Sequence, residues 1–285
     1  MKLLRHGPRG QEKPGLLDAD GRVRDLSAHV DDLAGAVLSE AGLERLRALD
    51  PAALPVVPEG TRLGPPVAGV GKVMAIGLNY ADHAAETGGE VPPEPVLFMK
   101  ATSAINGPND PVVLPRGSVA TDWEVELGVV IGTPAKYVTE DDALTHVAGY
   151  TIVNDVSERH YQIKRAGQWT KGKSCDTFCP LGPWLVTRDE IADPQALGLW
   201  LDVDEQRMQT GSTATMVYGV AFLVSYLSQL MTLHPGDVIA TGTPPGVGMG
   251  RRPRVYLRPG NEMRLGIDGL GEQRQTVEAD TADAG

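Results

Sequence analysis

The stretch TDWEVELGVVIG, residues 121–132, alternates polar and apolar residues and then becomes a continuous apolar run. Successive side chains of an extended strand point to opposite faces, so Asp122, Glu124 and Glu126 fall on one face and the apolar residues between them on the other. Like charges on one face repel, and carboxylates beside a buried run are costly unless a partner neutralises them. The stretch therefore predicts a half-buried strand that is either a solvated edge or one wall of a cation site.

The chain around this stretch is mostly short strand-like runs between Gly and Pro turns. The clearest runs are VVLP (112–115), VAGYTIVND (147–155), LGLWLDVD (197–204) and EMRLGID (262–268). One uncharged segment, residues 211–233, carries apolar residues at helical spacing, which favours a buried amphipathic helix over a membrane span. The residues with this spacing are Met216, Val220, Leu223, Leu227 and Leu230. The sequence predicts a strand-rich α+β protein.

Residues 1–66 form a unit of their own in this interpretation. GLLDADGRVRDL (15–26) predicts two short strands about a turn, and EAGLERLRAL (40–49) predicts a short helix that ends before Asp50-Pro51. Prolines at positions 51, 55, 58, 65 and 66 predict a stiff, extended connector. We expect a small N-terminal domain over residues 1–66 and a larger domain over residues 67–285.

The composition and charge limit the kinds of partner that the chain could bind. The net charge of −11 argues against binding to nucleic acid or to an anionic membrane, because both need clustered Lys and Arg. The N-terminal MKLLRHGPRG lacks the apolar stretch of a secretory signal, so we expect the chain to stay in the cytoplasm. Cys175 and Cys179 have neither a zinc nor a redox spacing and are expected to be free thiols in a reducing compartment.

A third carboxylate could complete a cation site with the acidic stretch. The apolar run 150–153 ends at Asn154-Asp155, which puts a carboxylate at a strand end. Residues two apart on a strand lie roughly 6.5–7 Å apart at their Cα atoms, within reach of one ion for two Glu side chains. Glu124, Glu126 and Asp155 would form an all-oxygen set of the kind that suits Mg²⁺ or Mn²⁺. Spacing alone favours a plain solvated face over a metal site, because an E-x-E strand is usually solvated.

His83 and Glu86, in NYADHAAE, stand three residues apart and share a face if the segment is helical. A carboxylate beside an imidazole fixes its tautomer and raises its basicity, as a general base for water requires. The alternative is a His–Glu pair on a surface helix that has no catalytic role.

Two further segments resemble phosphate-binding loops. GQWTKGKS (167–174) fits GxxxxGK[ST], but the buried strand before it and the helix after it are missing, so we do not expect a nucleotide site. Lys173 stays a candidate for polarising a carbonyl or holding an oxyanion. In TGTPPGVGMG (241–250) the backbone amides and the Thr241 or Thr243 hydroxyl could hold an anion.

Six segments in this order strongly resemble the fumarylacetoacetate hydrolase family: GLNYADHAAE, EPVLFMK, DWEVELGVVIG, NDVSERHYQ, WTKGKS and TLHPGDVIATGTPPGVG. The resemblance covers about residues 67–275, and the first 66 residues resemble the small N-terminal α/β domain of many bacterial members. It implies a mixed β-sandwich roll, a homodimer and a divalent cation, usually Mg²⁺, with Mn²⁺ as the alternative.

The resemblance also implies roles for individual residues. Glu124, Glu126 and Asp155 match metal ligands, His83 and Glu86 match the pair that activates water, and Lys173 matches a catalytic lysine. Gln162 and Thr243 match residues that contact the bound oxo-acid. Asn79 stands where some members have a further acidic ligand, so three protein carboxylates are expected. Asp122 lies outside the match.

The activity implied is hydrolysis of the C3–C4 bond of a 2,4-dioxo acid to pyruvate, or a related 2-oxo acid, and a carboxylate. Among substrates, a 2,4-diketo-3-deoxy sugar acid ranks first and a simple acylpyruvate second. Oxo-acid decarboxylation, keto-enol isomerisation and ureidoglycolate lysis on the same scaffold remain open. A catalytically silent, metal-binding member is the alternative of another class.

Overall fold

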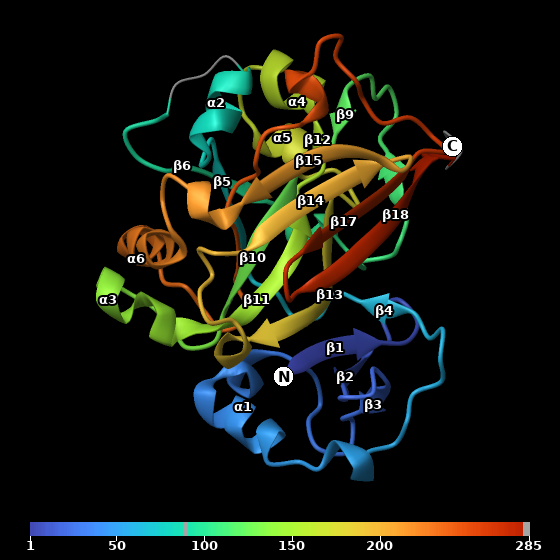
Figure 1. Ribbon diagram of the computed structural model, residues 1–285, viewed down its shortest axis with the longest axis vertical. Helices are drawn as coiled ribbons and strands as arrows, with labels where there is room; N and C mark the ends of the chain where they lie inside the picture. The colour runs from blue at the N-terminus through green and yellow to red at the C-terminus, as the bar shows by residue number, and fades with distance from the viewer. Residues whose placement is uncertain (88–90, 282–285) are drawn as a thin grey trace.

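The computed structural model describes residues 1–87 and 91–281, and it places residues 125–131 of the acidic stretch in the middle of a large mixed sheet (Figure 1). Within these residues the sheet has 11 strands. Its main path runs through β3 (Val23–Asp25), β2 (Lys13–Leu17), β1 (Lys2–His6), β13 (Cys179–Thr187), β11 (Val147–Asn154), β10 (Val125–Ile131), β16 (Val238–Ala240), β5 (Val73–Gly77) and β6 (Val96–Lys100). The short strands β4 (Leu63–Gly64) and β7 (Ile105–Asn106) pair with β1 and β13.

A second sheet packs against the first. It runs in the order β15 (Gln206–Ser212), β14 (Gly198–Val203), β17 (Glu262–Ile267), β18 (Gly271–Ala279) and β8 (Val112–Leu114). Strands β14, β17 and β18 lie across β10, β11 and β13, and the two sheets enclose one apolar core (Figure 1). This arrangement confirms the strand-rich α+β fold with a sandwich of mixed sheets.

Strand β10 is buried on both faces, which differs from the half-buried strand that the alternation predicts. All seven of its residues are buried, and Glu126 is 2% exposed. Polar and apolar side chains do alternate along the strand, but the polar face points into the protein interior, toward α4 (Arg159–Lys164) and α5 (Thr170–Lys173). A solvated edge is therefore the wrong alternative of the two.

The N-terminal residues join the larger sheet through one strand pair. β1 pairs antiparallel with β13, with Leu3 opposite Leu185, and β2 and β3 continue the sheet outward. The expected helix is α1 (Glu40–Arg47), whose Ser39 side chain accepts a hydrogen bond from the Gly42 amide. The sheet is continuous across residue 66, and the division into domains at that residue stays a prediction.

The remaining helices are short. They are α2 (Ala81–Thr87), α3 (Glu140–Ala143), α4, α5 and α6 (Val220–Leu230). The helix expected over residues 211–233 is thus correct only for its central part: Leu223 and Leu227 are buried, Leu230 is 54% exposed, and Met216 lies before the helix begins.

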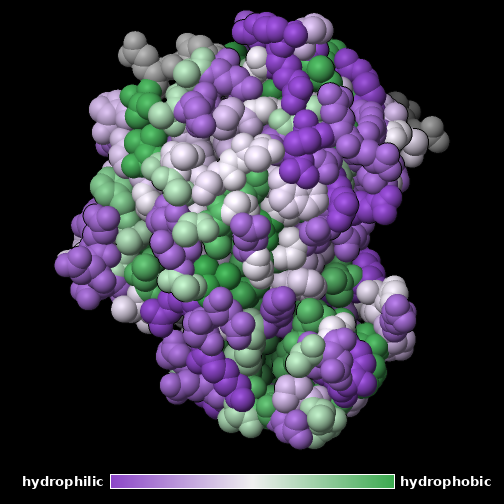
Figure 2. Space-filling model, in the orientation of Figure 1, coloured by the Kyte–Doolittle hydropathy of each residue, from purple (hydrophilic) through white to green (hydrophobic). Residues whose placement is uncertain are grey.

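None of the helices in residues 1–87 and 91–281 is long and apolar enough to cross a membrane. Hydrophilic side chains cover much of the face shown in Figure 2, most densely at its upper right.

Candidate active site

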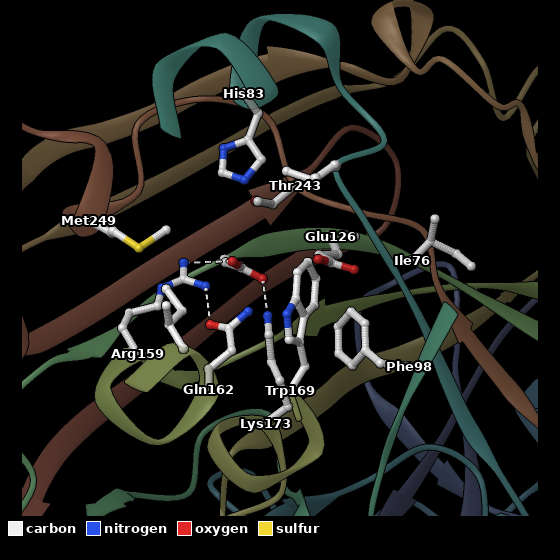
Figure 3. Close-up of a pocket in the computed structure, with 14 residues that line it drawn as sticks. Ile76, His83, Phe98, Glu126, Arg159, Gln162, Trp169, Lys173, Thr243 and Met249 are labelled. Atoms are coloured by element: carbon white, nitrogen blue, oxygen red, sulfur yellow. Dashed lines mark hydrogen bonds and ion pairs between the residues drawn. The ribbon is translucent and has the colours of Figure 1, made fainter. Parts of the chain in front are cut away.

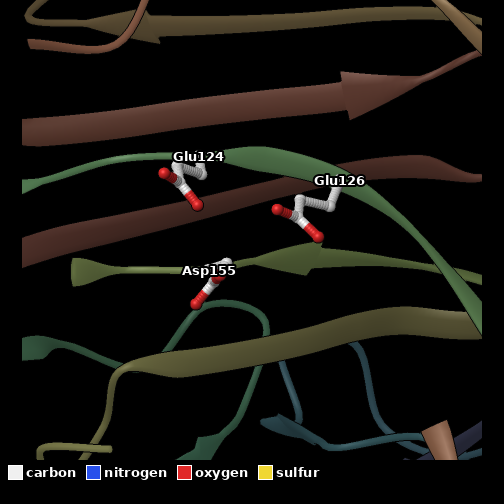
Figure 4. Close-up of side chains that lie close together, drawn as sticks. All are labelled: Glu124, Glu126 and Asp155. Atoms are coloured by element: carbon white, nitrogen blue, oxygen red, sulfur yellow. The ribbon is translucent and has the colours of Figure 1, made fainter. Parts of the chain in front are cut away.

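Three carboxylates converge where β10 and β11 begin to separate. The Asp155 amide donates to the Glu124 carbonyl at 2.9 Å, which fixes the end of β11 beside the start of β10. One carboxylate oxygen from each of Glu124, Glu126 and Asp155 lies within 4.8 Å of the other two (Figure 4). All three side chains are buried. The structure therefore brings together the three residues that the sequence proposes as ligands.

Three cationic side chains surround this cluster. Lys173 Nζ lies 2.6 Å from Glu124 Oε2 and 2.6 Å from Asp155 Oδ2. Lys100, at the end of β6, donates to the other oxygen of Asp155 and is itself fully buried. Arg159 Nη2 donates to Glu124 Oε1 at 2.6 Å. Glu124 and Asp155 are each held by two cations.

Glu126 is the exception in the cluster. In the described part of the chain one hydrogen bond reaches its carboxylate, from the Gly242 amide to Oε2 at 2.9 Å. Burial raises the pKa of Glu126 well above its ordinary value, and the negative charges of Asp155 and Glu124 raise it further. For Glu124, burial also acts to raise the pKa, but the charges of Arg159 and Lys173 outweigh it and hold the pKa well below its ordinary value.

The donor set fits a hard divalent cation. The cluster offers carboxylate oxygens only, and Glu126 keeps an oxygen that no hydrogen bond in the described residues uses. The raised pKa of Glu126 also favours a cation at this position. A bound cation would take the place of the proton that the raised pKa favours on the metal-free carboxyl. Glu124, Glu126 and Asp155 are therefore the residues that could hold a metal.

The Gly-rich loop 241–250 binds anions, but these anions are the protein's own carboxylates. The Gly246 amide donates to Glu86 at 2.9 and 3.0 Å, in addition to the bond from Gly242 to Glu126. The Gly248 and Met249 amides donate to Asp122 at 2.7 and 3.0 Å. The loop thus fixes three acidic side chains of the site at once.

His83 and Glu86 lie above the carboxylates on α2. The Nδ1 atom of His83 is 3.6 Å from Glu86 Oε2, as their spacing on a helix predicts. Burial works to raise the pKa of Glu86, but the hydrogen bonds from His83 and from the Gly246 amide lower it. The His83 imidazole points into the pocket from the opposite side to Lys173 (Figure 3).

A cavity of about 220 Å³ joins these groups. Its lining includes His83, Glu124, Glu126, Lys173 and the two expected substrate contacts, Gln162 and Thr243. Gln162 Oε1 accepts from Arg159, and the Thr243 hydroxyl donates to the Val125 carbonyl while accepting from Gln209. The structure brings all eight expected site residues to one region, although their roles toward a substrate stay predictions.

Three contributors were missed by the sequence interpretation or left without a role. Arg159 bridges Asp122 and Glu124, with Nε 2.9 Å from Asp122 Oδ2, and it also lines the cavity. Asp122 is therefore a buried support of the site. Lys100 supports Asp155. Its position at the end of an apolar strand, VLFMK, is the one sequence signal that could have suggested a buried lysine.

The Asn79 side chain makes hydrogen bonds to the backbone of two other segments. Its amide nitrogen donates to the Tyr218 and Thr241 carbonyls, and its oxygen accepts from the Tyr218 amide. The GQWTKGKS segment ends in the four-residue helix α5 and is followed by strand β13, so the helix that a phosphate-binding loop needs does not follow it.

Known proteins share this architecture over nearly the whole chain. The family description "Fumarylacetoacetate (FAA) hydrolase C-terminal" matches residues 72–278. A curated protein of Burkholderia multivorans named "Putative hydrolase" is 68% identical over 98% of this chain and 99% of its own.

Two solved structures are similar to this chain. A maleylpyruvate hydrolase from Sphingobium sp. SYK-6, in complex with manganese(II) and pyruvate, has a TM-score of 0.81 and 30% identity over 98% of this chain and 99% of its own. A 2-hydroxyhepta-2,4-diene-1,7-dioate isomerase from Mycobacterium marinum has a TM-score of 0.75 and 32% identity over 99% of both chains. With its fold, its acidic cluster and this family match, the chain belongs to the fumarylacetoacetate hydrolase family.

Proposed function

We propose that this protein is a divalent-metal-dependent hydrolase that cleaves the C3–C4 bond of a 2,4-dioxo acid of the acylpyruvate type. The observation that carries the proposal is one cavity lined by Glu124 and Glu126 of the acidic cluster, the buried Lys173 and the imidazole of His83. A related structure is a hydrolase bound to manganese(II) and pyruvate, and pyruvate is one of the products that this cleavage gives.

Glu124, Glu126 and Asp155 would hold the cation, Mg²⁺ or Mn²⁺, which supplies a Lewis acid that polarises an oxo group and offsets developing negative charge. Lys173 places an ammonium in the same wall. Burial works to lower the pKa of Lys173, but Asp155 and Glu124 raise it above its ordinary value, so the side chain stays charged. A charged, dry donor of this kind stabilises an enolate oxygen far better than water does.

His83 would take a proton from water, and Glu86 would hold the imidazole in the orientation and tautomer that this requires. The water oxygen forms a bond to C4, the C3–C4 bond breaks, and its electron pair goes to C3. The carbanion is delocalised as the pyruvate enolate and takes up a proton at C3. Acylpyruvate and water thus give a carboxylate, pyruvate and one proton.

The scaffold also supports other reactions of an oxo-acid, since a related structure is an isomerase. Incubation of acetylpyruvate with Mg²⁺ in ¹⁸O-labelled water separates them. Hydrolysis puts the label into acetate and releases pyruvate; decarboxylation releases carbon dioxide, and isomerisation leaves the carbon chain whole. Ureidoglycolate cleavage to glyoxylate is assayed in parallel. Metal binding without turnover of any of these compounds would favour a catalytically silent protein.

We also propose that the protein is a cytoplasmic homodimer that acts on a small oxo-acid. Light scattering after size-exclusion chromatography would report a mass of twice the 30.3 kDa chain.

A further inference from the structure

We infer that the substrate's acyl tail is uncharged and apolar, of the alkyl, alkenyl or aryl class. This inference rests on the proposed function, because it concerns the part of the 2,4-dioxo acid that extends from the reacting carbons into the rest of the cavity. It differs from the sugar-acid preference expected from the sequence, and from the dicarboxylate in the name of the related dioate isomerase.

Apolar side chains from five segments of the chain form most of the rest of the cavity lining. They are Ile76 on β5, Phe98 on β6, Ile163 on α4, Trp169 before α5, and Met249 in the Gly-rich loop, with Leu78 just after β5. Figure 3 shows Ile76 and Phe98 on the side of Glu126 that faces away from Met249, and Met249 beside Arg159. A tail that passes Glu126 on the side of Ile76 and Phe98 meets hydrocarbon.

The aromatic part of this wall is closely packed. The Phe98 and Trp169 rings lie 5.3 Å apart at 59° to one another, and Lys173 Nζ is 5.0 Å from the centre of the Phe98 ring. Trp169 rests on the backbone of β5, where a Cβ atom on Gly77 would lie only 2.4 Å from the indole. The wall therefore begins directly beside the catalytic lysine and is too well packed to swing away at low cost.

One position of the wall exposes an apolar side chain. Ile163 is 44% exposed although it faces the cavity. An apolar tail would cover the Ile163 side chain, which a charged or hydroxylated tail would leave in contact with polar groups.

A second carboxylate on the substrate would find no Lys or Arg side chain in the lining that is not already paired with a carboxylate of the protein. The two cationic residues among the lining side chains are Arg159 and Lys173. Arg159 is occupied by Asp122, Glu124 and Gln162, and Lys173 by Glu124 and Asp155. The Thr243 hydroxyl donates to the Val125 carbonyl and accepts from Gln209, so it has no hydrogen left to donate to the hydroxyls of a sugar-acid tail.

Three six-carbon 2-oxo acids test the inference without requiring turnover: 2-oxohexanoate, 2-oxohexanedioate and 2-oxo-3-deoxyhexonate. They share the 2-oxo acid head and differ only in an apolar, carboxylate or polyol tail. Calorimetry with the full chain and saturating Mg²⁺ should show 2-oxohexanoate binding at least tenfold more tightly than either of the others. Equal or tighter binding of the dioate or the polyol, or no binding of any of the three, overturns the inference.

Ile163→Arg places a new cation in the wall at an exposed position, where a substitution is well tolerated by the fold. It should shift the preference between hexanoate and hexanedioate by tenfold or more toward the dioate. Val119→Arg is the matched control, since Val119 is 56% exposed and lies outside the cavity lining; it should leave the preference unchanged. The same shift in both variants would overturn the assignment of Ile163 to the tail wall. Failure of acetylpyruvate hydrolysis with the binding order intact would instead contradict the proposed function alone.

Discussion

Lys173 and Asp155 form a buried ion pair, with Nζ 2.6 Å from Oδ2, at the wall of the cavity. The same ammonium contacts Glu124, so it neutralises two of the three expected metal ligands. In the proposed reaction Lys173 would therefore have two opposing effects. It would stabilise an anionic reaction intermediate, and it would compete with a cation for the carboxylates.

Lys173→Gln should separate these effects. We expect the rate of C–C cleavage to fall by about 10²–10³, the usual cost of losing one donor to a developing oxyanion. Divalent-cation binding should be equal or tighter, because the competing positive charge is gone. Calorimetric titration with Mn²⁺, beside a pyruvate-release assay, checks both. Loss of metal binding in this variant would mean that Lys173 builds the acidic cluster and does not act on the substrate.

Glu126→Gln should remove the cation site while stabilising the metal-free protein above about pH 5. A carboxyl whose pKa is raised by folding contributes its stability below the unfolded value, near 4.5, and loses it as the pH rises through the folded value. Glutamine carries no proton to lose, so the variant should lack this decline. Each kcal/mol of difference moves the melting temperature by about 2–4 °C in a protein of this size. Melting curves from pH 4.5 to 9 with chelator present measure it; parallel curves for the two proteins would contradict the raised pKa.

Metal binding should release protons from the wild-type protein at pH values below the raised pKa of Glu126. The proton held by Glu126 has to leave when a cation binds. Titration with Mg²⁺ in two buffers of different ionisation enthalpy gives the number released. Affinity should rise with pH, and Glu126→Gln should show neither the release nor the affinity.

His83→Asn should lower hydrolysis by about 10²–10⁴, the range for loss of a general base, with metal binding unchanged. Decarboxylation of oxaloacetate, which needs no activated water, should be spared relative to hydrolysis. Glu86→Gln is the milder variant of the same pair for comparison, because it keeps a hydrogen-bond acceptor near the Gly246 amide but removes the negative charge. An equal loss of both reactions in His83→Asn would show that the His83–Glu86 pair is not specific to water activation.

Arg159→Leu should destabilise the protein by about 3–5 kcal/mol, because it leaves Asp122 and Glu124 as buried carboxylates with one cation fewer. Arg159→Lys should recover only part of this, since an ammonium cannot span both acids as the guanidinium does. Denaturant unfolding provides the measurement. Full stability in Arg159→Leu would mean that these acids are neutral in the native protein.

The acidic cluster could be predicted from the sequence because its ligands lie at short spacings on regular strands. Glu126 lies on β10, Glu124 directly precedes that strand, and Asp155 directly follows β11, the strand paired with it. The supporting cations could not be predicted in this way. Lys100 meets Asp155 across 55 positions of the chain and Arg159 meets Asp122 across 37, and no local period encodes such contacts.

The helix expected over residues 211–233 was too long for a similar reason. Apolar spacing continues N-terminally to Met216, but the Ser212 side chain accepts from the Ala214 amide and starts a short turn. The helix begins after Gly219, where the Val220 amide donates to the distant Gln195 side chain. Local side-chain bonding and a tertiary contact decide that boundary, and neither appears in the hydrophobic pattern.

The most direct test is pyruvate release from acetylpyruvate by the wild-type protein and by Glu126→Gln, each with Mg²⁺ and with excess chelator. The acidic cluster predicts rapid release by the wild type with Mg²⁺, and loss of that release with chelator or in the variant. Release that persists undiminished in the presence of chelator, or in Glu126→Gln, would contradict a metal-dependent hydrolase built on Glu124, Glu126 and Asp155.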